Sequence, residues 1–197
     1  MKYTNDYLQA FIKLNDLYNK ATIEQRHHGN NWYYKAYLYA KKLASKYELS
    51  IYKVVGIISA LSPNNKWERN LLDAELFLEN PLLETKVCTY TDNRIKAQKI
   101  YGSNSAREVY NILGGRKTKS FYENILRHDN SKKVTVDLWI FRAGELPNTA
   151  KNYQLLEEVI QDLAKIYSKK PHQVQAIIWG VIRDMQNETK SNNEIAS

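Results

Sequence analysis

The chain has 197 residues, of which 43% are hydrophobic and 25% are charged, and its formal net charge is +8. This length allows one domain or two small lobes that share a core, and a single cysteine, Cys88, excludes an internal disulfide and a four-cysteine iron–sulfur cluster. The lone cysteine, the lack of a long apolar stretch and the lack of a signal-peptide pattern predict a soluble, intracellular protein of the cytoplasm, without a membrane partner.

Long stretches of 3.6-residue periodicity, with few glycines and prolines, predict an all-α fold. In chain order, helices are predicted over residues 6–20, 32–46, 51–61, 67–79, 94–101, 106–113, 116–125, 138–143, 149–167 and 171–186. Asn30-Asn31 is expected to cap the second of these helices. The third is apolar nearly all round, so we expect it to be the central buried helix, with Gly56 allowing another helix to approach closely. Residues 187–197 have a polar composition and are expected to be disordered.

The stretch from Asn111 to Tyr122 predicts two helices joined by a tight turn. Gly114 and Gly115 are expected to supply the positive φ that such a reversal needs. The second helix then begins with unpaired backbone N–H groups beside the cationic side chains of Arg116, Lys117 and Lys119. This combination suits a phosphate group.

Positive charge is concentrated around this turn. Between Arg94 and Lys133 there are ten Lys or Arg residues against three Asp or Glu residues, a net charge of +7. A polyanion such as nucleic acid is the partner that this favours, although a basic face would also serve solubility alone. Further along, a single acid, Asp137, interrupts the apolar run from Val134 to Phe141, where it would also make a good N-cap for the helix that follows.

Two motifs carry a family resemblance. Leu-Gly-Gly-Arg-Lys-Thr-Lys, residues 113–119, followed by Val-Thr-Val-Asp-Leu-Trp-Ile-Phe-Arg, residues 134–142, resembles the helix-hairpin-helix DNA glycosylase superfamily, which includes endonuclease III and 8-oxoguanine DNA glycosylase. The family has a Leu-Pro-Gly-Val-Gly-x-Lys-Thr-like hairpin and then a Val-Asp-Thr-His-Val-x-Arg-like stretch. Here the hairpin is shortened to Gly114-Gly115, and Leu138-Trp139 replaces the usual Thr-His. The motif Ser-Pro-x-x-x-Trp, residues 62–67, also resembles uncharacterised phage proteins.

The resemblance implies a two-lobed, all-α glycosylase-like fold, with one domain over residues 1–186 and its hairpin at about 105–127. It places Lys117 on the family's lysine nucleophile and Asp137 on its catalytic aspartate. Because the hairpin is shortened, Lys119 is the alternative nucleophile, and all three cations of the hairpin could instead contact only phosphate.

The implied function is a DNA glycosylase that flips a damaged or modified base out of double-stranded DNA, with β-lyase (AP lyase) activity. We expect a monomer without a catalytic cofactor or metal, apart from a structural monovalent cation at the hairpin. The alternatives are a DNA-binding protein that kept the fold and lost the chemistry, such as a modulator of phage or host DNA metabolism, and a base-modifying transferase.

The polar loop Ser62–Lys66 follows the most apolar predicted helix, which Pro63 ends. By resemblance, Asn64 and Asn65 match the family's wedge into the space left by a flipped base, with Lys66 beside them on the DNA. An ordinary turn is the alternative, because Pro-Asn-Asn is good turn chemistry.

A flipped base also needs an aromatic pocket, because it leaves its stacked neighbours behind. We nominate Trp139, Trp67 and Tyr122 for this pocket, although side chains of this kind more often belong to a core.

Overall fold

The computed structural model describes residues 3–81, 87 and 90–195, with side chains described as far as residue 187. Cys88, on which the expectation of a reducing compartment rests, lies outside the described residues. The described residues form ten α-helices and no strand, so the all-α prediction is confirmed. In chain order they are α1 (Asn5–Lys20), α2 (Ile23–Lys46), α3 (Ile51–Leu61), α4 (Trp67–Glu79), α5 (Thr91–Tyr101), α6 (Ala106–Leu113), α7 (Arg116–Leu126), α8 (Leu138–Ala143), α9 (Ala150–Ile166) and α10 (Pro171–Ile195).

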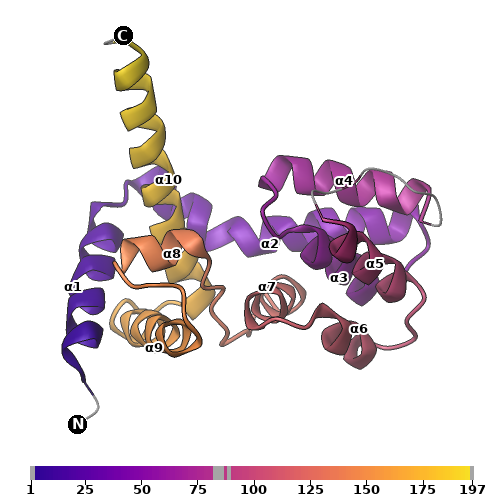
Figure 1. Ribbon diagram of the computed structural model, residues 1–197, viewed down its shortest axis with the longest axis horizontal. Coiled ribbons are helices and arrows are strands. Elements are labelled where there is room, and N and C mark those ends of the chain that lie inside the picture. Colours follow the sequence, from indigo (N-terminus) through magenta and orange to yellow (C-terminus); the bar gives the residue numbers. More distant parts are fainter. Residues whose placement is uncertain (1–2, 82–86, 88–89, 196–197) are drawn as a thin grey trace. The chain divides into compact units, whose positions relative to one another are not determined.

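The chain divides into two compact units (Figure 1). Unit 1 combines residues 1–33 with residues 130–197, and unit 2 is the continuous segment 34–129. The chain passes from unit 1 to unit 2 inside α2, and it returns to unit 1 at Asn130, between α7 and α8. Unit 1 therefore holds the two ends of the chain, and unit 2 is inserted between them.

Helix α3 is the centre of unit 2, as its apolar sequence predicts. Every residue from Val54 to Leu61 is buried, and α3 packs against α4, α5, α6 and α7. Gly56 permits one of these contacts, because a Cβ atom there would lie 2.4 Å from Cγ1 of Val109 and 3.0 Å from Cγ2 of Ile100. The predicted close approach at Gly56 is therefore confirmed.

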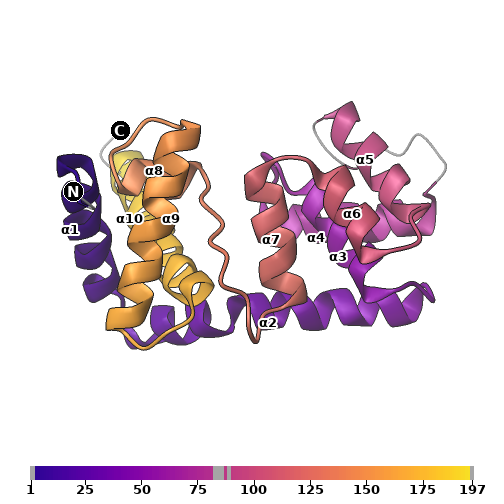
Figure 2. The ribbon, with the colours of Figure 1, turned by 90° about the horizontal axis from the view of Figure 1, so that it is seen from below.

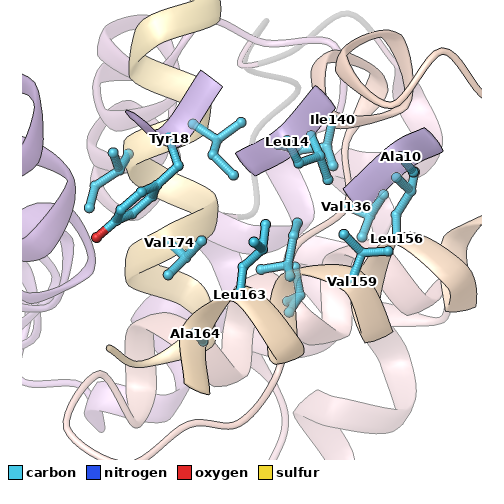
Figure 3. Packing of buried hydrophobic residues seen from close by; sticks show 14 of the residues in the cluster. Ala10, Leu14, Tyr18, Val136, Ile140, Leu156, Val159, Leu163, Ala164 and Val174 are labelled. Carbon is cyan, nitrogen blue, oxygen red and sulfur yellow. The ribbon is translucent and has the colours of Figure 1, made fainter. Parts of the chain in front are cut away.

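The core of unit 1 is assembled from apolar stripes on several helices. Helices α1, α8, α9 and α10 pack against one another, and their buried side chains meet in one cluster (Figure 3). Leu14 of α1, Ile140 of α8 and Leu163 of α9 are all fully buried in it. The last helix contributes an apolar stripe, each member of which is buried: Val174, Ile177, Ile178, Val181 and Ile182.

The start of the second helix was predicted wrongly. Helix α2 begins at Ile23 and passes through Asn30-Asn31 without a break, and the Asn31 amide donates to the carbonyl of His27 within the helix. The true N-terminus is a capping box: Gln25 N–H donates to Thr22 Oγ1 (3.2 Å), and Thr22 N–H donates to Gln25 Oε1 (2.9 Å).

The other end of the chain also differs from prediction. Helix α10 continues to Ile195, where the composition predicts disorder from Asn187 onwards. Backbone hydrogen bonds continue this helix beyond Ile182, the last buried residue among the side chains described as far as residue 187. Figure 1 shows this part of α10 projecting past the other helices of unit 1.

Candidate nucleic-acid interface

The predicted hairpin is present in unit 2 as α6, two glycines and α7 (Figure 2). Gly114 has φ +73°, a value that L side chains rarely adopt, so a glycine is required there. Gly115 has φ −64° and is the extended N-cap of α7. The reversal thus takes its positive φ from Gly114 alone, and the expectation of positive φ at Gly115 is wrong.

The N-terminus of α7 is basic and has no side-chain cap. No acid lies in its first turn, and Arg116 is exposed, whereas Lys117 and Lys119 are half-buried. Thr118 does not cap either, because its hydroxyl donates backward to the carbonyl of Gly115 (3.1 Å). The positive end of the helix dipole and three cationic side chains therefore coincide, as the hairpin sequence predicts.

Two tyrosines of unit 2 support this end of α7. The Lys119 ammonium lies 4.7 Å from the ring centroid of Tyr110, close enough for a cation–π contact. The ring of Tyr110 lies 6.5 Å from that of Tyr122.

Tyr122 is only 2% exposed and its hydroxyl has no hydrogen-bond partner among the described residues. Burial, and secondarily the nearby Glu123, raises the pKa of this hydroxyl. Tyr122 is therefore a core residue of unit 2.

In the loop between α3 and α4, the two asparagines have different surroundings. Asn65 is held from both sides, because its amide donates to Oδ2 of Asp73 (2.8 Å) and to the carbonyl of Leu61 (3.4 Å). Asn64 is exposed at φ +56°, in the left-handed region that asparagine tolerates, and its amide donates to the hydroxyl of Tyr90 (2.8 Å). Asn64 and Lys66 are thus the exposed residues of this loop.

The anchor of the loop is a buried carboxylate. Asp73 is buried, and it accepts from Asn65 and also from the guanidinium of Arg69 (2.8 Å). Trp67, the first residue of α4, is half-buried and meets Phe121 of α7 edge-on at 6.2 Å. The structure therefore connects the loop to α7 through Trp67 and Phe121.

Asp137 lies in unit 1 and is the N-cap of α8, the role that was the local alternative to catalysis. Its Oδ1 accepts the N–H of Ile140 at 3.1 Å, and its side chain is half-buried. The backbone before it is held by Tyr153, whose hydroxyl donates to the carbonyl of Val134 (3.0 Å) and accepts from Val136 N–H (3.3 Å). The carboxylate is thus fixed in direction by its own bond and by the residues that precede it.

Trp139, nominated for the base pocket, lies two residues further on in α8. It packs partly buried against the core of unit 1, and the guanidinium of Arg142 lies 5.2 Å from its ring centroid. Unit 1 thus contains Asp137 and Trp139, and unit 2 contains the hairpin, Asn64, Lys66 and Trp67. Tyr153 was not among the predicted site residues, because nothing in its spacing signals that it holds the backbone in front of Asp137.

Residues 4–186 match the model of a protein family described as a family of unknown function, DUF7178. The chain belongs to this family. The match extends across both units and includes the hairpin, the loop Ser62–Lys66 and Asp137. No curated protein and no solved structure matches the chain significantly.

Among the described helices, none combines the length and apolar character needed to span a membrane. The described part of the chain likewise contains no group of three or more His, Cys, Asp or Glu side chains placed to hold a metal ion.

Proposed function

We propose that this DUF7178 protein binds double-stranded DNA through the α6–α7 hairpin of unit 2 and removes a base from it as a DNA glycosylase. The observation that supports the proposal most is the N-terminus of α7, which follows a tight turn at Gly114 and has no side-chain cap and no acid in its first turn. Arg116, Lys117 and Lys119 surround this helix end. A DNA phosphate offers the negative charge and the acceptor oxygens that such an end binds.

Asp137 is the proposed catalytic carboxylate. As an N-glycosidic bond breaks, positive charge develops on the deoxyribose, and a fixed carboxylate stabilises it without having to reorient. The Ile140 N–H and the Tyr153 clamp hold Asp137 and its backbone in one direction. Two further features support the proposal. Asp137 lies in the motif at residues 134–142 that resembles the glycosylase family, and the chain divides into two units, as a two-lobed fold would.

Lys117 is the proposed nucleophile of a β-lyase step. After the base has left, the Lys117 amine would attack C1′ of the ring-opened, aldehyde form of the sugar, and loss of water would give a Schiff base. β-Elimination would then break the C3′–O bond and release the phosphate on that side. Lys119 is the less suitable candidate, because its ammonium already contacts the ring of Tyr110. Lys117 is the second residue of α7, so it lies in the first turn of the helix, beside the proposed phosphate site.

A second function, DNA binding without chemistry, is favoured by one observation. The carboxylate of Asp137 already caps α8, a structural role that accounts for an acid at this position without any catalysis. The hairpin would bind DNA in either case, so binding and base release need separate experiments.

Binding is tested by measuring the affinity for a generic duplex as a function of salt. The logarithm of the binding constant falls linearly with the logarithm of the salt concentration. Each phosphate contact adds about one to the steepness of this slope, because a neutralised phosphate releases condensed counterion. Lys119→Ala should therefore reduce the slope and weaken binding to all sequences alike. Lys41→Ala is the matched control, since it removes the same charge from an exposed position on α2. Equal losses in the two variants, or a wild-type slope near zero, would reject the hairpin as the DNA site.

Base release is tested with duplexes that carry uracil, 8-oxoguanine, alkylated bases and phage-type modified bases. On any substrate found, Asp137→Asn should lower the rate by about 10²–10³. Asparagine also caps helices well, so the melting temperature should change little. Retained activity in this variant would exclude the glycosylase mechanism, and a collapsed fold would show that Asp137 is only a cap.

The lyase step has its own readout. Borohydride should trap a covalent protein–DNA adduct with the wild type and not with Lys117→Gln, whereas Lys119→Gln should still be trapped. If nothing is trapped while Asp137→Asn abolishes base release, the hairpin lysines serve only to bind phosphate.

A further inference from the structure

Helix α10 has two different faces. One is the apolar stripe buried in the core of unit 1. The other carries Trp179, Gly180 and Arg183, which are all partly exposed. Arg183 stands four residues after Trp179 and three after Gly180, so the three positions are neighbours on one surface of the helix.

These residues form part of an aromatic and cationic cluster. The guanidinium of Arg183 lies 4.6 Å from the ring centroid of Trp179. The Trp179 ring also meets Trp32 of α2 edge-on at 6.1 Å and 67°, and Trp32 meets Tyr33 edge-on at 4.8 Å. The cluster is anchored in the interior, because Tyr33 and Gln175 are both buried and the Tyr33 hydroxyl donates to Gln175 Oε1 (2.7 Å).

Arg183 keeps its hydrogen-bonding capacity. No described acidic side chain forms an ion pair with it, and the amide of Gln25 donates to the neighbouring carboxylate of Asp184 (2.6 Å). A guanidinium placed over an indole ring can still donate its N–H groups to an acceptor at its edge. This arrangement suits a planar ring together with an anionic oxygen.

Gly180 leaves open space beside this cluster. A Cβ atom at this position would meet no described atom within 4 Å, so packing does not require a glycine. Glycine inside a helix is less stable than alanine, which makes its presence there costly for the fold. A ligand that approaches the helix backbone closely would account for it.

We propose that Trp32, Trp179, Gly180 and Arg183 form a binding platform for an unpaired nucleotide of single-stranded nucleic acid. The base stacks against the exposed part of the tryptophan and arginine surface, and the guanidinium edge donates to its phosphate. Only an unpaired nucleotide offers its ring face, since the bases of a duplex are stacked on one another. The platform lies within unit 1, so it does not depend on the hairpin function proposed above.

The test uses fluorescein-labelled oligo(dT) and oligo(U) of twelve nucleotides, with anisotropy measured at low salt on the full chain. Trp179→Leu should weaken binding about tenfold, the order expected for one lost base stack. Arg183→Gln should weaken binding and also lower the salt slope by about one. Tighter binding of oligo(dT) would assign the platform to DNA, and tighter binding of oligo(U) would assign it to RNA.

Gly180→Leu separates binding from folding. Leucine favours a helix and fills the open space, so this variant should melt no lower than the wild type while it binds the oligonucleotides more weakly. Lys151→Gln, at an exposed position of α9, controls for the loss of one positive charge and should bind like the wild type.

Three results would overturn the platform: no binding of either oligonucleotide by the wild type, unchanged affinity in Gly180→Leu and Arg183→Gln, or an equal loss in Lys151→Gln. Lys119→Ala should weaken duplex binding, and it should weaken oligonucleotide binding less than Arg183→Gln does. Failure of the hairpin and failure of the platform are therefore seen in different variants and with different probes.

Discussion

Helix α3 in unit 2 is buried on every side from Val54 to Leu61, whereas α1, α9 and α10 in unit 1 each bury one stripe. Unit 2 is a continuous segment built around that one helix, and unit 1 joins segments that stand before and after it in the chain. Unit 2 can therefore form its core from residues near in sequence, and unit 1 must bring its first helix to its last two. Matched substitutions, one in each unit, should therefore show whether the two cores differ in stability.

Removing a central side chain should have the largest effect. Ile57 of unit 2 and Ile160 of unit 1 are each 0% exposed, so Ile57→Ala and Ile160→Ala should each lower the free energy of unfolding by about 4 kcal/mol. Ile166→Ala, at a position 62% exposed, should have little effect and serves as the control.

Hydrogen exchange then shows where each of these substitutions acts. Because each unit has its own core, Ile57→Ala should lower amide protection mainly in residues 34–129, and Ile160→Ala mainly in the rest. An equal loss across both units in both variants would show that they unfold as one, and the comparison would fail.

Glycines at helix contacts sharpen the comparison. A Cβ atom at Gly29 of unit 1 would lie 2.5 Å from Cγ1 of Ile177 and 2.7 Å from its backbone nitrogen, which cannot rotate away. At Gly56 of unit 2 the nearest atoms are the side-chain ends of Val109 and Ile100. Gly29→Ala should therefore cost about 3 kcal/mol, and Gly56→Ala only about 1 kcal/mol.

Both values are obtained from denaturant unfolding, with Gly180→Ala as the reference. Since that position faces open space, alanine should stabilise the protein there by up to about 1 kcal/mol. If Gly29→Ala and Gly56→Ala lower the free energy of unfolding equally, the side chains of Val109 and Ile100 cannot shift to make room for a Cβ atom at Gly56, and the expected difference is wrong.

Helix caps provide a smaller effect in both units. Thr22 Oγ1 accepts from Gln25 N–H, and Ser105 Oγ accepts from Glu108 N–H, each at 3.2 Å. Thr22→Ala and Ser105→Ala should each cost about 1 kcal/mol in thermal or chemical unfolding. Thr22→Ser and Ser105→Thr keep the acceptor oxygen and should be nearly neutral; if they cost as much as alanine, the capping bonds do not explain the loss.

The sequence pattern found the parts of the fold that depend on local periodicity. The central helix and the hairpin were both predicted, because each is visible within one window of the chain. The start of α2 was missed because Gly29 and Asn30-Asn31 resemble a helix boundary, and the signal Thr22-x-x-Gln25 was not used. The reason a glycine is tolerated inside that helix is its contact with Ile177, which is remote in sequence.

The candidate site was predicted unevenly for the same reason. Gly114 and the cations around α7 follow from local turn and helix chemistry, and so does Asp137 as a cap. Burial of Tyr122 and the bond from Asn65 to Asp73 depend on how helices pack, which residue spacing does not report. The edge-on contact of Trp32 with Trp179 joins α2 to α10, and residue spacing does not report it either.

The smallest expected effect is a pH dependence confined to unit 2. The ammonium of Lys46 donates to Oε1 of Glu75 at 2.8 Å, and this bond lowers the pKa of Glu75 against the opposing effect of its partial burial. A carboxyl whose pKa is lowered by folding stabilises the folded state at a pH above its unfolded value. That contribution is lost as the pH falls through the lowered pKa, because the folded protein must then take up a proton it binds weakly.

Glu75→Gln should therefore melt slightly below the wild type at pH 7, and the difference should shrink as the pH falls below about 4. Calorimetry at both pH values measures it, with Glu158→Gln, on α9 of unit 1, run in parallel to show what the loss of a carboxylate does elsewhere. A difference that stays constant down to low pH would mean that Glu75 stabilises unit 2 through packing, and its charge would then play no part.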